Sequence, residues 1–525
     1  MSYLSLYFLV KVGLYYSNYI GFHWVFNLLF AIALSWPIAS GLTLRIRRYL
    51  TGPLALILLY HDSFLPTPGR VFSQIGALSG FSPAYMLELL TRMYNPLALI
   101  GLLCIVSVYF ILASRIRFST LAFISILSVP LTGQLSARNH TESTNRQTNT
   151  NQLGSTMPAL QSTVAEANPQ SELTAFYNKE SKRNLNFSTG GKTPAFDIIL
   201  LHVCSLSWDD MDFINERNHP LLKRFDLVFT NFNSAASYSG PASIRVLRGS
   251  CGQSPYEKLY KNTDPQCYVF PNLEAIGYKA HGLLNHDGLF ERFANNLEMR
   301  TGLKGKLDSN QGALVAMQNF DGSPIFDDYA LLSKWWTERE ARGGQPEALY
   351  YNSISLHDGN RFVGQGTKSS METYKPRMNK LMADLDRFLS QLEKSGKPVL
   401  VMLIPEHGAS LRGDKIQMSG MREIPSPEIT MVPAAMKLIG LKHVDAVTPR
   451  VITEPISFFG IYSLLADLLT NSPYLPDAKP ITARLDKIEK TAFVSENGEV
   501  VIMRTASGAY MMKSGGSDWT PYVSK

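Results

Sequence analysis

The sequence predicts an α/β protein with two parts: an N-terminal bundle of about five transmembrane helices, and an external domain with a largely parallel sheet flanked by helices. Three observations support this prediction. Residues 1–137 are strongly apolar. Residues 138–193 are rich in Asn, Thr, Ser and Gln and lack apolar periodicity, which is typical of a flexible polar linker. In residues 194–525, strand-like and helix-like stretches alternate, as they do in proteins with mainly parallel sheets.

The apolar part contains five stretches whose lengths approach the ~20 residues that a helix needs to cross a bilayer. They are residues 4–20, 22–43, 50–65, 95–114 and 118–136. Arginines lie in the loops after the second and the fourth stretch, and the positive-inside rule places both loops in the cytoplasm. The N-terminus is then cytoplasmic. The loop between the third and fourth stretches and everything after the fifth stretch lie outside.

The charge distribution argues against a nucleic-acid partner. The formal net charge is +7, but it includes the loop arginines that set the membrane topology. The sequence has no basic stripe with interleaved aromatic residues and no nucleic-acid-binding motif.

The four cysteines have different expected roles. Cys104 lies within the fourth apolar stretch, where no chemistry is expected. Cys251 and Cys267 flank a short loop of the external part, where an oxidising compartment favours a disulfide. Cys204 is left unpaired in the same compartment. Metal ligation would protect its thiolate from oxidation, and a buried structural cysteine is the alternative.

The external part shows clear signals for individual elements. Strands are expected over residues 197–203, 226–230, 348–356, 399–404 and 434–439. Helices are expected over residues 374–395 and 456–470, and a hairpin is expected around Asn497–Gly498.

Residues with catalytic or metal-binding side chains follow several of these strands. Cys204 follows the first strand, His357 follows the third, and Glu406 with His407 follows the fourth. Open α/β sheets bind their ligands at the carboxyl ends of their strands, so these side chains are expected to converge. Ser239 precedes a Gly-Pro pair where a helix is expected to start, and the free N–H groups of a helix start attract phosphate oxygens.

A thiolate, a carboxylate, an imidazole and a hydroxyl form an acceptable four-coordinate zinc site. A hydroxyl bound to zinc loses its proton more easily, so Ser239 would become a nucleophile suited to displacement at phosphorus. Ser237 is the alternative attacking hydroxyl. His357 is expected to act as a general acid or base, and Gly408 is expected to allow a sharp turn. A helix-capping serine and ordinary loop histidines are the competing interpretations.

Five motifs together resemble one known family. They are "CSLSWDD", "SYSGPASIRVLRGSCGQ", "SLHDGN", "PEHGA" and "MREIPSP". With the five apolar stretches, they resemble the BcsG family of cellulose phosphoethanolamine transferases, which belong to bacterial cellulose-secretion systems. The external part is also similar to the alkaline phosphatase and sulfatase superfamily. The resemblance implies an alkaline-phosphatase-like catalytic domain in the periplasm, carried by a multi-pass protein of the bacterial inner membrane.

The resemblance also implies roles for individual residues. Cys204, Glu406 and His407 would bind Zn²⁺, with Ser239 as the nucleophile and fourth ligand. His357 would be a general acid or base near the donor phosphate.

Further positions match the family as well. Tyr238 and Arg422 correspond to active-site positions and are expected to contact the substrate, and the disulfide between Cys251 and Cys267 has a counterpart. Relatives that act on lipid A carry a carboxylate in place of Cys204 and usually a threonine nucleophile. The cysteine therefore favours the cellulose branch.

The implied reaction moves phosphoethanolamine from phosphatidylethanolamine to glucose 6-hydroxyls of nascent cellulose through a covalent serine intermediate. The implied partner is the cellulose synthase complex of the inner membrane. Two alternatives stay open. One is a transferase of phosphoethanolamine or phosphoglycerol that acts on lipid A or another glycan. The other is a non-catalytic glucan-binding scaffold of a secretion complex, whose structural zinc would be closed by four protein ligands.

Overall fold

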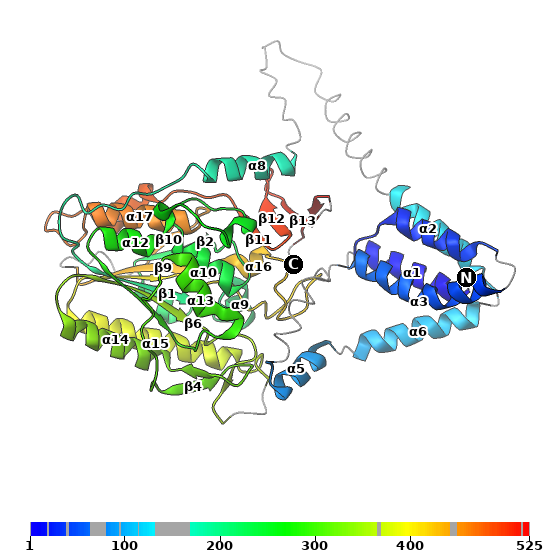
Figure 1. Cartoon of the computed structure of the whole chain (residues 1–525), viewed down its shortest axis with the longest axis horizontal. Helices are drawn as coiled ribbons and strands as arrows, with labels where there is room; N and C mark the ends of the chain where they lie inside the picture. Colours follow the sequence, from blue (N-terminus) through cyan, green and yellow to red (C-terminus); the bar gives the residue numbers. More distant parts are fainter. Residues whose placement is uncertain are drawn as a thin grey trace, which may run out of the picture. The chain divides into compact units, whose positions relative to one another are not determined.

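The computed structural model describes residues 2–17, 20–37, 41–63, 80–93, 96–113, 115–131, 168–364, 369–441, 449–515 and 518–523. The chain divides into two compact units (Figure 1). The first comprises Met1–Ser73 with Leu90–Ala165, and the second comprises Gln74–Leu89 with Glu166–Lys525.

The first unit consists of helices that overlap the five predicted apolar stretches. They are α1 (Ser2–Tyr16), α2 (Trp24–Ser35), α3 (Leu42–Asp62), α6 (Pro96–Leu112) and a helix over residues 118–131. Within the described residues, none of these helices combines the length and the apolar character that a membrane crossing requires. The five membrane spans therefore stay a prediction.

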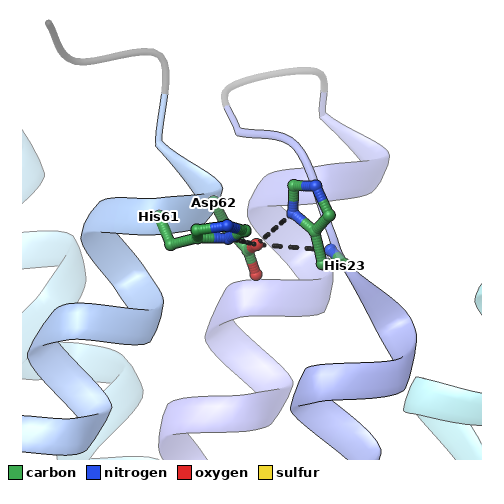
Figure 2. A group of neighbouring side chains, drawn as sticks. All are labelled: His23, His61 and Asp62. Atoms are coloured by element: carbon green, nitrogen blue, oxygen red, sulfur yellow. Dashed lines mark hydrogen bonds and ion pairs between the residues drawn. The ribbon is translucent and has the colours of Figure 1, made fainter. Parts of the chain in front are cut away.

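A buried polar network connects α1, α2 and α3. The carboxylate of Asp62 lies 2.8 Å from Lys11 Nζ, 2.7 Å from Asn27 Nδ2 and 2.7 Å from His23 Nδ1. His61 lies beside the same carboxylate, as Figure 2 shows. A buried charge is costly unless it is paired, and Lys11 already compensates the charge of Asp62. We therefore interpret this group as a structural network of the first unit.

The second unit is built on a seven-stranded sheet with helices on both faces (Figure 1). The strands lie in the order β10-β2-β9-β8-β1-β6-β3. Their bounds are β1 (Asp197–Val203), β2 (Leu227–Asn233), β3 (Lys279–Leu284), β6 (Glu347–Ser353), β8 (Val399–Leu403), β9 (Met431–Ile439) and β10 (Arg450–Ile452). Of these, β9 runs antiparallel to both of its neighbours, and the other pairs are parallel. The predicted α/β class and the largely parallel sheet are confirmed.

Two apolar cores cover the two faces of this sheet. The helices α10 (Ser239–Leu247), α12 (Val269–Ala275) and α17 (Phe458–Thr470) contribute to the first core, and α14 (Asp328–Arg342) and α15 (Tyr374–Ser395) contribute to the second. Successive residues of a strand point to opposite faces, so Ile198 lies in the first core and Ile199 in the second. Since both faces are covered, every residue of β1 is buried, which explains its nearly continuous apolar sequence.

Smaller elements complete the second unit. A three-stranded sheet contains β4 (Val315–Gln318), β5 (Pro324–Phe326) and β7 (Arg361–Phe362), and a four-stranded sheet contains β11 (Val494–Asn497), β12 (Val500–Arg504), β13 (Tyr510–Ser514) and β14 (Thr520–Pro521). The shorter helices are α9 (Trp208–Phe213), α11 (Tyr256–Leu259), α13 (Phe293–Thr301) and α16 (Pro427–Thr430). The part of α5 (Pro83–Met93) up to Leu89 also belongs to this unit. The strands β11 and β12 form the predicted hairpin.

The boundary of the predicted linker differs from the structure. Residues 169–180 form helix α8 (Pro169–Glu180), whose Leu173 and Phe176 are buried against Val494 and Met503 of the four-stranded sheet. This helix is therefore part of the second unit, although its sequence is polar enough to be taken for a linker. Residues 138–167 of the predicted linker lie outside the described residues.

A disulfide and a group of ion pairs also stabilise the second unit. Cys251 and Cys267 form the predicted disulfide. On strand β3, His281 Nδ1 lies 2.9 Å from Asp308 and His281 Nε2 lies 3.2 Å from Glu347. Burial acts to lower the pKa of His281, but the two carboxylates outweigh burial and hold this pKa above its usual value.

Candidate metal centre and active site

The candidate site lies at one edge of the seven-stranded sheet, where four strands end. Strands β1, β2, β6 and β8 all run in the same direction, so their carboxyl ends share this edge. Cys204 directly follows β1, and Glu406 and His407 follow β8. Ser239 follows β2 as the first residue of α10, and His357 follows β6. The topology therefore explains why residues about two hundred positions apart in the sequence meet.

Backbone hydrogen bonds hold the strand ends together beyond the sheet. The N–H of Glu406 donates to the carbonyl of Val203 at 2.8 Å, and the N–H of Leu206 donates to the carbonyl of His407 at 2.7 Å. The segments that carry the site residues are therefore fixed to each other directly.

Three of the predicted metal ligands lie in one buried cluster. The candidate ligand atoms of Cys204, Glu406 and His407 all lie within 4.8 Å of one another. Cys204 Sγ is 3.8 Å from His407 Nε2, which is 3.7 Å from Glu406 Oε2. Ser239 Oγ is 3.4 Å from the sulfur and 3.5 Å from the same imidazole nitrogen. The structure thus brings together the four residues predicted to form the zinc site.

The orientation of these atoms fits a metal ion. Glu406 Oε2 is buried and has no hydrogen-bond partner among the described residues, which is costly for a carboxylate oxygen. His407 Nδ1 donates to the carbonyl of Gly408 at 2.8 Å, so Nε2 is left with its lone pair towards the cluster. A sulfur, an imidazole nitrogen and a carboxylate oxygen are donors that Zn²⁺ accepts.

Burial sets the protonation of the cluster when no metal is bound. Burial raises the pKa of the Cys204 thiol to about 12 and raises the pKa of Glu406. Burial also lowers the pKa of His407, and the nearby charge of Arg422 lowers it further. Burial therefore favours a thiol, a carboxylic acid and a neutral imidazole. A bound divalent cation would reverse this balance and favour the thiolate and the carboxylate.

Arg422 and Tyr238 lie beside this cluster, and their expected contact with the substrate stays a prediction. Arg422 Nη1 lies 3.4 Å from His407 Nδ1 and donates to Ser205 Oγ at 3.3 Å. The guanidinium of Arg422 lies 5.3 Å from the ring centroid of Tyr238, whose hydroxyl donates to Glu423 at 2.8 Å. A buried guanidinium at this place provides positive charge and donors for an anionic group such as a phosphate.

The imidazole of His357 is held in one tautomer. Its Nδ1 donates to the carbonyl of Asp358 at 2.8 Å, so Nε2 carries the lone pair. Burial lowers the pKa of His357 to about 4, and the charge of Arg422 acts in the same direction. The imidazole is therefore neutral near pH 7 and carries a lone pair on Nε2, and its lowered pKa makes it a weaker base than an exposed histidine.

The geometry distinguishes the two candidate serines. Ser239 Oγ contacts two of the ligand residues. Ser237 Oγ is buried and has no hydrogen-bond partner among the described residues. The contacts of the cluster therefore favour Ser239.

The reason for a glycine at position 408 differs from the expected one. The φ angle of Gly408 is not positive, so a sharp left-handed turn does not require glycine here. A Cβ at this position would instead lie 2.4 Å from Ser207 Oγ and 2.6 Å from Asp210 Oδ2. Gly408 is required because the two loops approach each other closely.

Two residues that were not predicted from the sequence, Asn352 and Asp210, hold the candidate ligands or the chain next to them. The side-chain amide of Asn352, within β6, donates to Glu406 Oε1 at 2.6 Å. Its side-chain oxygen Oδ1 lies 3.0 Å from His286 Nε2. The carboxylate of Asp210 accepts from the N–H of Ala409 at 2.6 Å and so holds the chain just after the ligands. An amide within a buried strand was the available signal for Asn352, since such a group needs partners.

The sequence comparisons place the chain in a family. Two family models match it: the "Cellulose biosynthesis protein BcsG N-terminal domain" over residues 4–131 and the "Cellulose biosynthesis protein BcsG C-terminal domain" over residues 154–519. The cellulose biosynthesis proteins BcsG of Escherichia coli (strain K12) and of Salmonella typhimurium are each 35% identical to this chain. Each alignment covers 99% of this chain and 95% of the relative.

Solved structures align less closely. A protein in the alkaline phosphatase superfamily from Vibrio parahaemolyticus aligns with a TM-score of 0.47 and 14% identity over 67% of this chain and 87% of its own. The lipooligosaccharide phosphoethanolamine transferase A from Neisseria meningitidis, an integral membrane protein, aligns with a TM-score of 0.42 and 12% identity over 88% of this chain and 95% of its own. The assignment rests on the sequence matches: this chain belongs to the BcsG family of cellulose biosynthesis proteins.

Proposed function

We propose that the protein is a zinc-dependent transferase that moves phosphoethanolamine from phosphatidylethanolamine to glucose 6-hydroxyls of nascent cellulose. The observation that carries this proposal is the hydroxyl of Ser239, which lies beside a buried thiol, an imidazole and a carboxylate oxygen without a partner among the described residues. Family membership supports the acceptor, since both relatives are cellulose biosynthesis proteins by name.

Each group at the site has a role in this reaction. Cys204, Glu406 and His407 would hold Zn²⁺, which supplies a Lewis acid that favours the serine alkoxide and stabilises charge on oxygen. Ser239 is the first residue of α10, so the free N–H groups of that helix start are available to phosphate oxygens. Arg422 adds a fixed positive charge near the developing negative charge of the transferred group.

The reaction proceeds by two displacements. In the first, Ser239 Oγ forms a bond to phosphorus, and the bond between phosphorus and the diacylglycerol oxygen breaks. The serine proton passes to His357 Nε2 and then to the leaving oxygen, which gives diacylglycerol and a phosphoethanolamine-serine. In the second, a glucose 6-hydroxyl oxygen bonds to phosphorus and its proton passes to His357. The bond to Ser239 breaks, and the serine oxygen recovers a proton from His357.

The proposed location is the bacterial inner membrane, with a cytoplasmic N-terminus and a periplasmic catalytic domain beside the lipid donor and the cellulose synthase complex. Proximity to the membrane raises the effective concentration of the donor. Two observations support this topology. The disulfide between Cys251 and Cys267 is typical of an oxidising compartment. Glu88, from the loop after the third predicted span, pairs with Arg361 of the second unit, so this loop and the domain lie on the same side.

The substitution Ser239→Ala tests the nucleophile. We expect it to abolish the covalent phosphoethanolamine intermediate and to lower transfer by more than about 10³-fold, since a nucleophile cannot be replaced by binding alone. The matched control is Ser237→Ala, which should keep both the covalent intermediate and the transfer activity. Intact phosphoethanolamine, detected by mass spectrometry on a peptide of the Ser239→Ala protein, would refute the assignment.

The acceptor is tested separately. Purified protein in phosphatidylethanolamine vesicles should modify cello-oligosaccharides and leave lipid A unchanged. Modification of lipid A instead would support the proposed transfer of phosphoethanolamine and refute cellulose as its acceptor. Absence of any turnover of a chromogenic phosphoethanolamine ester by the zinc-loaded protein would favour a non-catalytic scaffold.

A further inference from the structure

A short segment from the N-terminal part of the sequence packs into the second unit. Residues 74–89 belong to this unit, although the chain on either side of them belongs to the first unit. Residues 81–88, called the inserted segment below, include the first turns of α5 (Pro83–Met93). The side chains of Tyr85 and Glu88 are both buried.

Tyr85 is bound to the residue that follows His357. The Tyr85 hydroxyl donates to Asp358 Oδ2 at 2.9 Å. The backbone carbonyl of the same Asp358 accepts from His357 Nδ1 at 2.8 Å. Asp358 therefore contacts both groups. Its carboxylate binds Tyr85 of the inserted segment, and its backbone carbonyl binds the imidazole of His357. Packing is close here, since a Cβ at Gly359 would lie 3.0 Å from the Tyr85 ring.

Glu88 holds the same loop at two further points. It pairs with Arg361 and accepts from the backbone N–H of Ser370 at 2.9 Å. The Ser370 hydroxyl lies 2.9 Å from Glu88 and 2.6 Å from Asp358, so it bridges the two carboxylates and donates to one at a time. Together, Tyr85 and Glu88 fix the chain that follows His357.

His357 also has an aromatic contact, with Phe320. The ring centroid of Phe320 lies 5.3 Å from that of His357, 5.0 Å from that of Phe81 and 5.8 Å from that of Tyr85. The N–H of Ser82 also donates to the carbonyl of Phe320 at 2.9 Å. Phe320 therefore lies between the inserted segment and the imidazole.

We infer that the inserted segment is a positioning element for His357, in which the hydroxyl of Tyr85 fixes Asp358 and thereby the direction in which His357 Nε2 points. This inference rests on the proposed function, in which His357 moves a proton in both displacements. Proton transfer depends on alignment, so a small misplacement of the imidazole lowers the rate. The complete site then requires the intact chain, because residues 168–525 by themselves lack the inserted segment.

The substitution Tyr85→Phe tests the inference in the full chain, in phosphatidylethanolamine vesicles with cello-oligosaccharide acceptor. We expect kcat to fall about 10-fold or more, while KM stays within about twofold and the zinc content is unchanged. The matched control is Tyr474→Phe, which removes a hydroxyl that donates to the carbonyl of Val399 at 3.0 Å, at the opposite end of β8 from the site. This control should keep the wild-type kcat. A Tyr85→Phe protein with wild-type kcat would overturn the inference.

A double-mutant cycle separates positioning from general stabilisation. If Tyr85 acts through His357, Tyr85→Phe should cause no further loss of rate in a His357→Ala background. If the two losses simply multiply, Tyr85 does not act through His357 and the inference is wrong.

A measurement independent of turnover distinguishes this inference from the proposed function. The imidazole resonances of His357, assigned with His357→Gln in histidine-labelled protein, should shift in Tyr85→Phe and stay unchanged in Tyr474→Phe. Unchanged resonances in Tyr85→Phe would overturn the inference whatever the activity. Absence of transfer by the wild-type protein would instead overturn the proposed function.

Discussion

Asn352 should determine how tightly the candidate centre holds its metal. Its side chain donates to Glu406 Oε1 at 2.6 Å, while Glu406 Oε2 has no partner among the described residues and points at the other ligands. The substitution Asn352→Leu keeps a similar volume and removes the donor. Glu406 would then lose the contact that orients its carboxylate, and the second oxygen would no longer be directed at the cluster.

Two independent considerations give the size of the effect. A hydrogen bond to a charged group contributes on the order of 1.5–3 kcal/mol. Loss of a residue that orients a metal ligand typically lowers metal affinity 10- to 100-fold, which corresponds to roughly 1.4–2.7 kcal/mol. Both considerations agree, so we expect the zinc dissociation constant of Asn352→Leu to rise by about one to two orders of magnitude.

The affinity is measured by competition between the metal-free protein and a chromophoric zinc chelator near neutral pH. The control is Ser463→Ala, which removes a hydroxyl that donates at 2.7 Å to the carbonyl of Lys487 and at 2.7 Å to that of Gly460, neither of which is a candidate ligand. It should lose stability without losing zinc affinity. A folded Asn352→Leu protein that binds zinc within twofold of the wild type would refute the reasoning.

Three further changes should follow from the structure. Gly408→Ala should lower the free energy of unfolding by about 1–3 kcal/mol and reduce zinc content, because the new Cβ would lie 2.4 Å from Ser207 Oγ; unchanged thermal unfolding would contradict this. Replacing both Cys251 and Cys267 by serine should cost about 3 kcal/mol in denaturant unfolding, since the disulfide closes a loop with a sequence separation of 16. The raised pKa of His281 stabilises the fold fully below its ordinary value of about 6.5, and this stabilisation is lost as pH rises through the folded pKa. His281→Gln should therefore destabilise the protein more near pH 5 than near pH 9 in denaturant titrations, and an equal loss at both would contradict the ion pairs.

Local sequence patterns were sufficient for the central strands and for helices α15 and α17, but they missed helix α14, which is 15 residues long and has a buried face. Strand β1 is covered on both faces, so its apolar residues are nearly continuous, and α15 shows its buried residues at helical spacing. The edge strands β3 and β10 were missed. Strand β3 contains His281 and Gly282, and β10 has three residues of which two are exposed, so neither shows a strand-like pattern. Helix α8 was missed because only a narrow face of it is buried.

The sequence by itself also predicted the candidate metal ligands and their convergence at one edge of the sheet. Cys204, Glu406, His407 and Ser239 follow strands or start a helix, and the carboxyl ends of parallel strands meet at one edge of a sheet. Only the tertiary structure decided which distant polar groups complete this site. Asn352 donates a hydrogen bond to Glu406, and Tyr85 of the inserted segment donates one to Asp358. A strand can be recognised in the sequence because its own side chains are buried in a periodic pattern. A hydrogen bond between residues hundreds of positions apart leaves no local pattern, because it depends on how the elements pack.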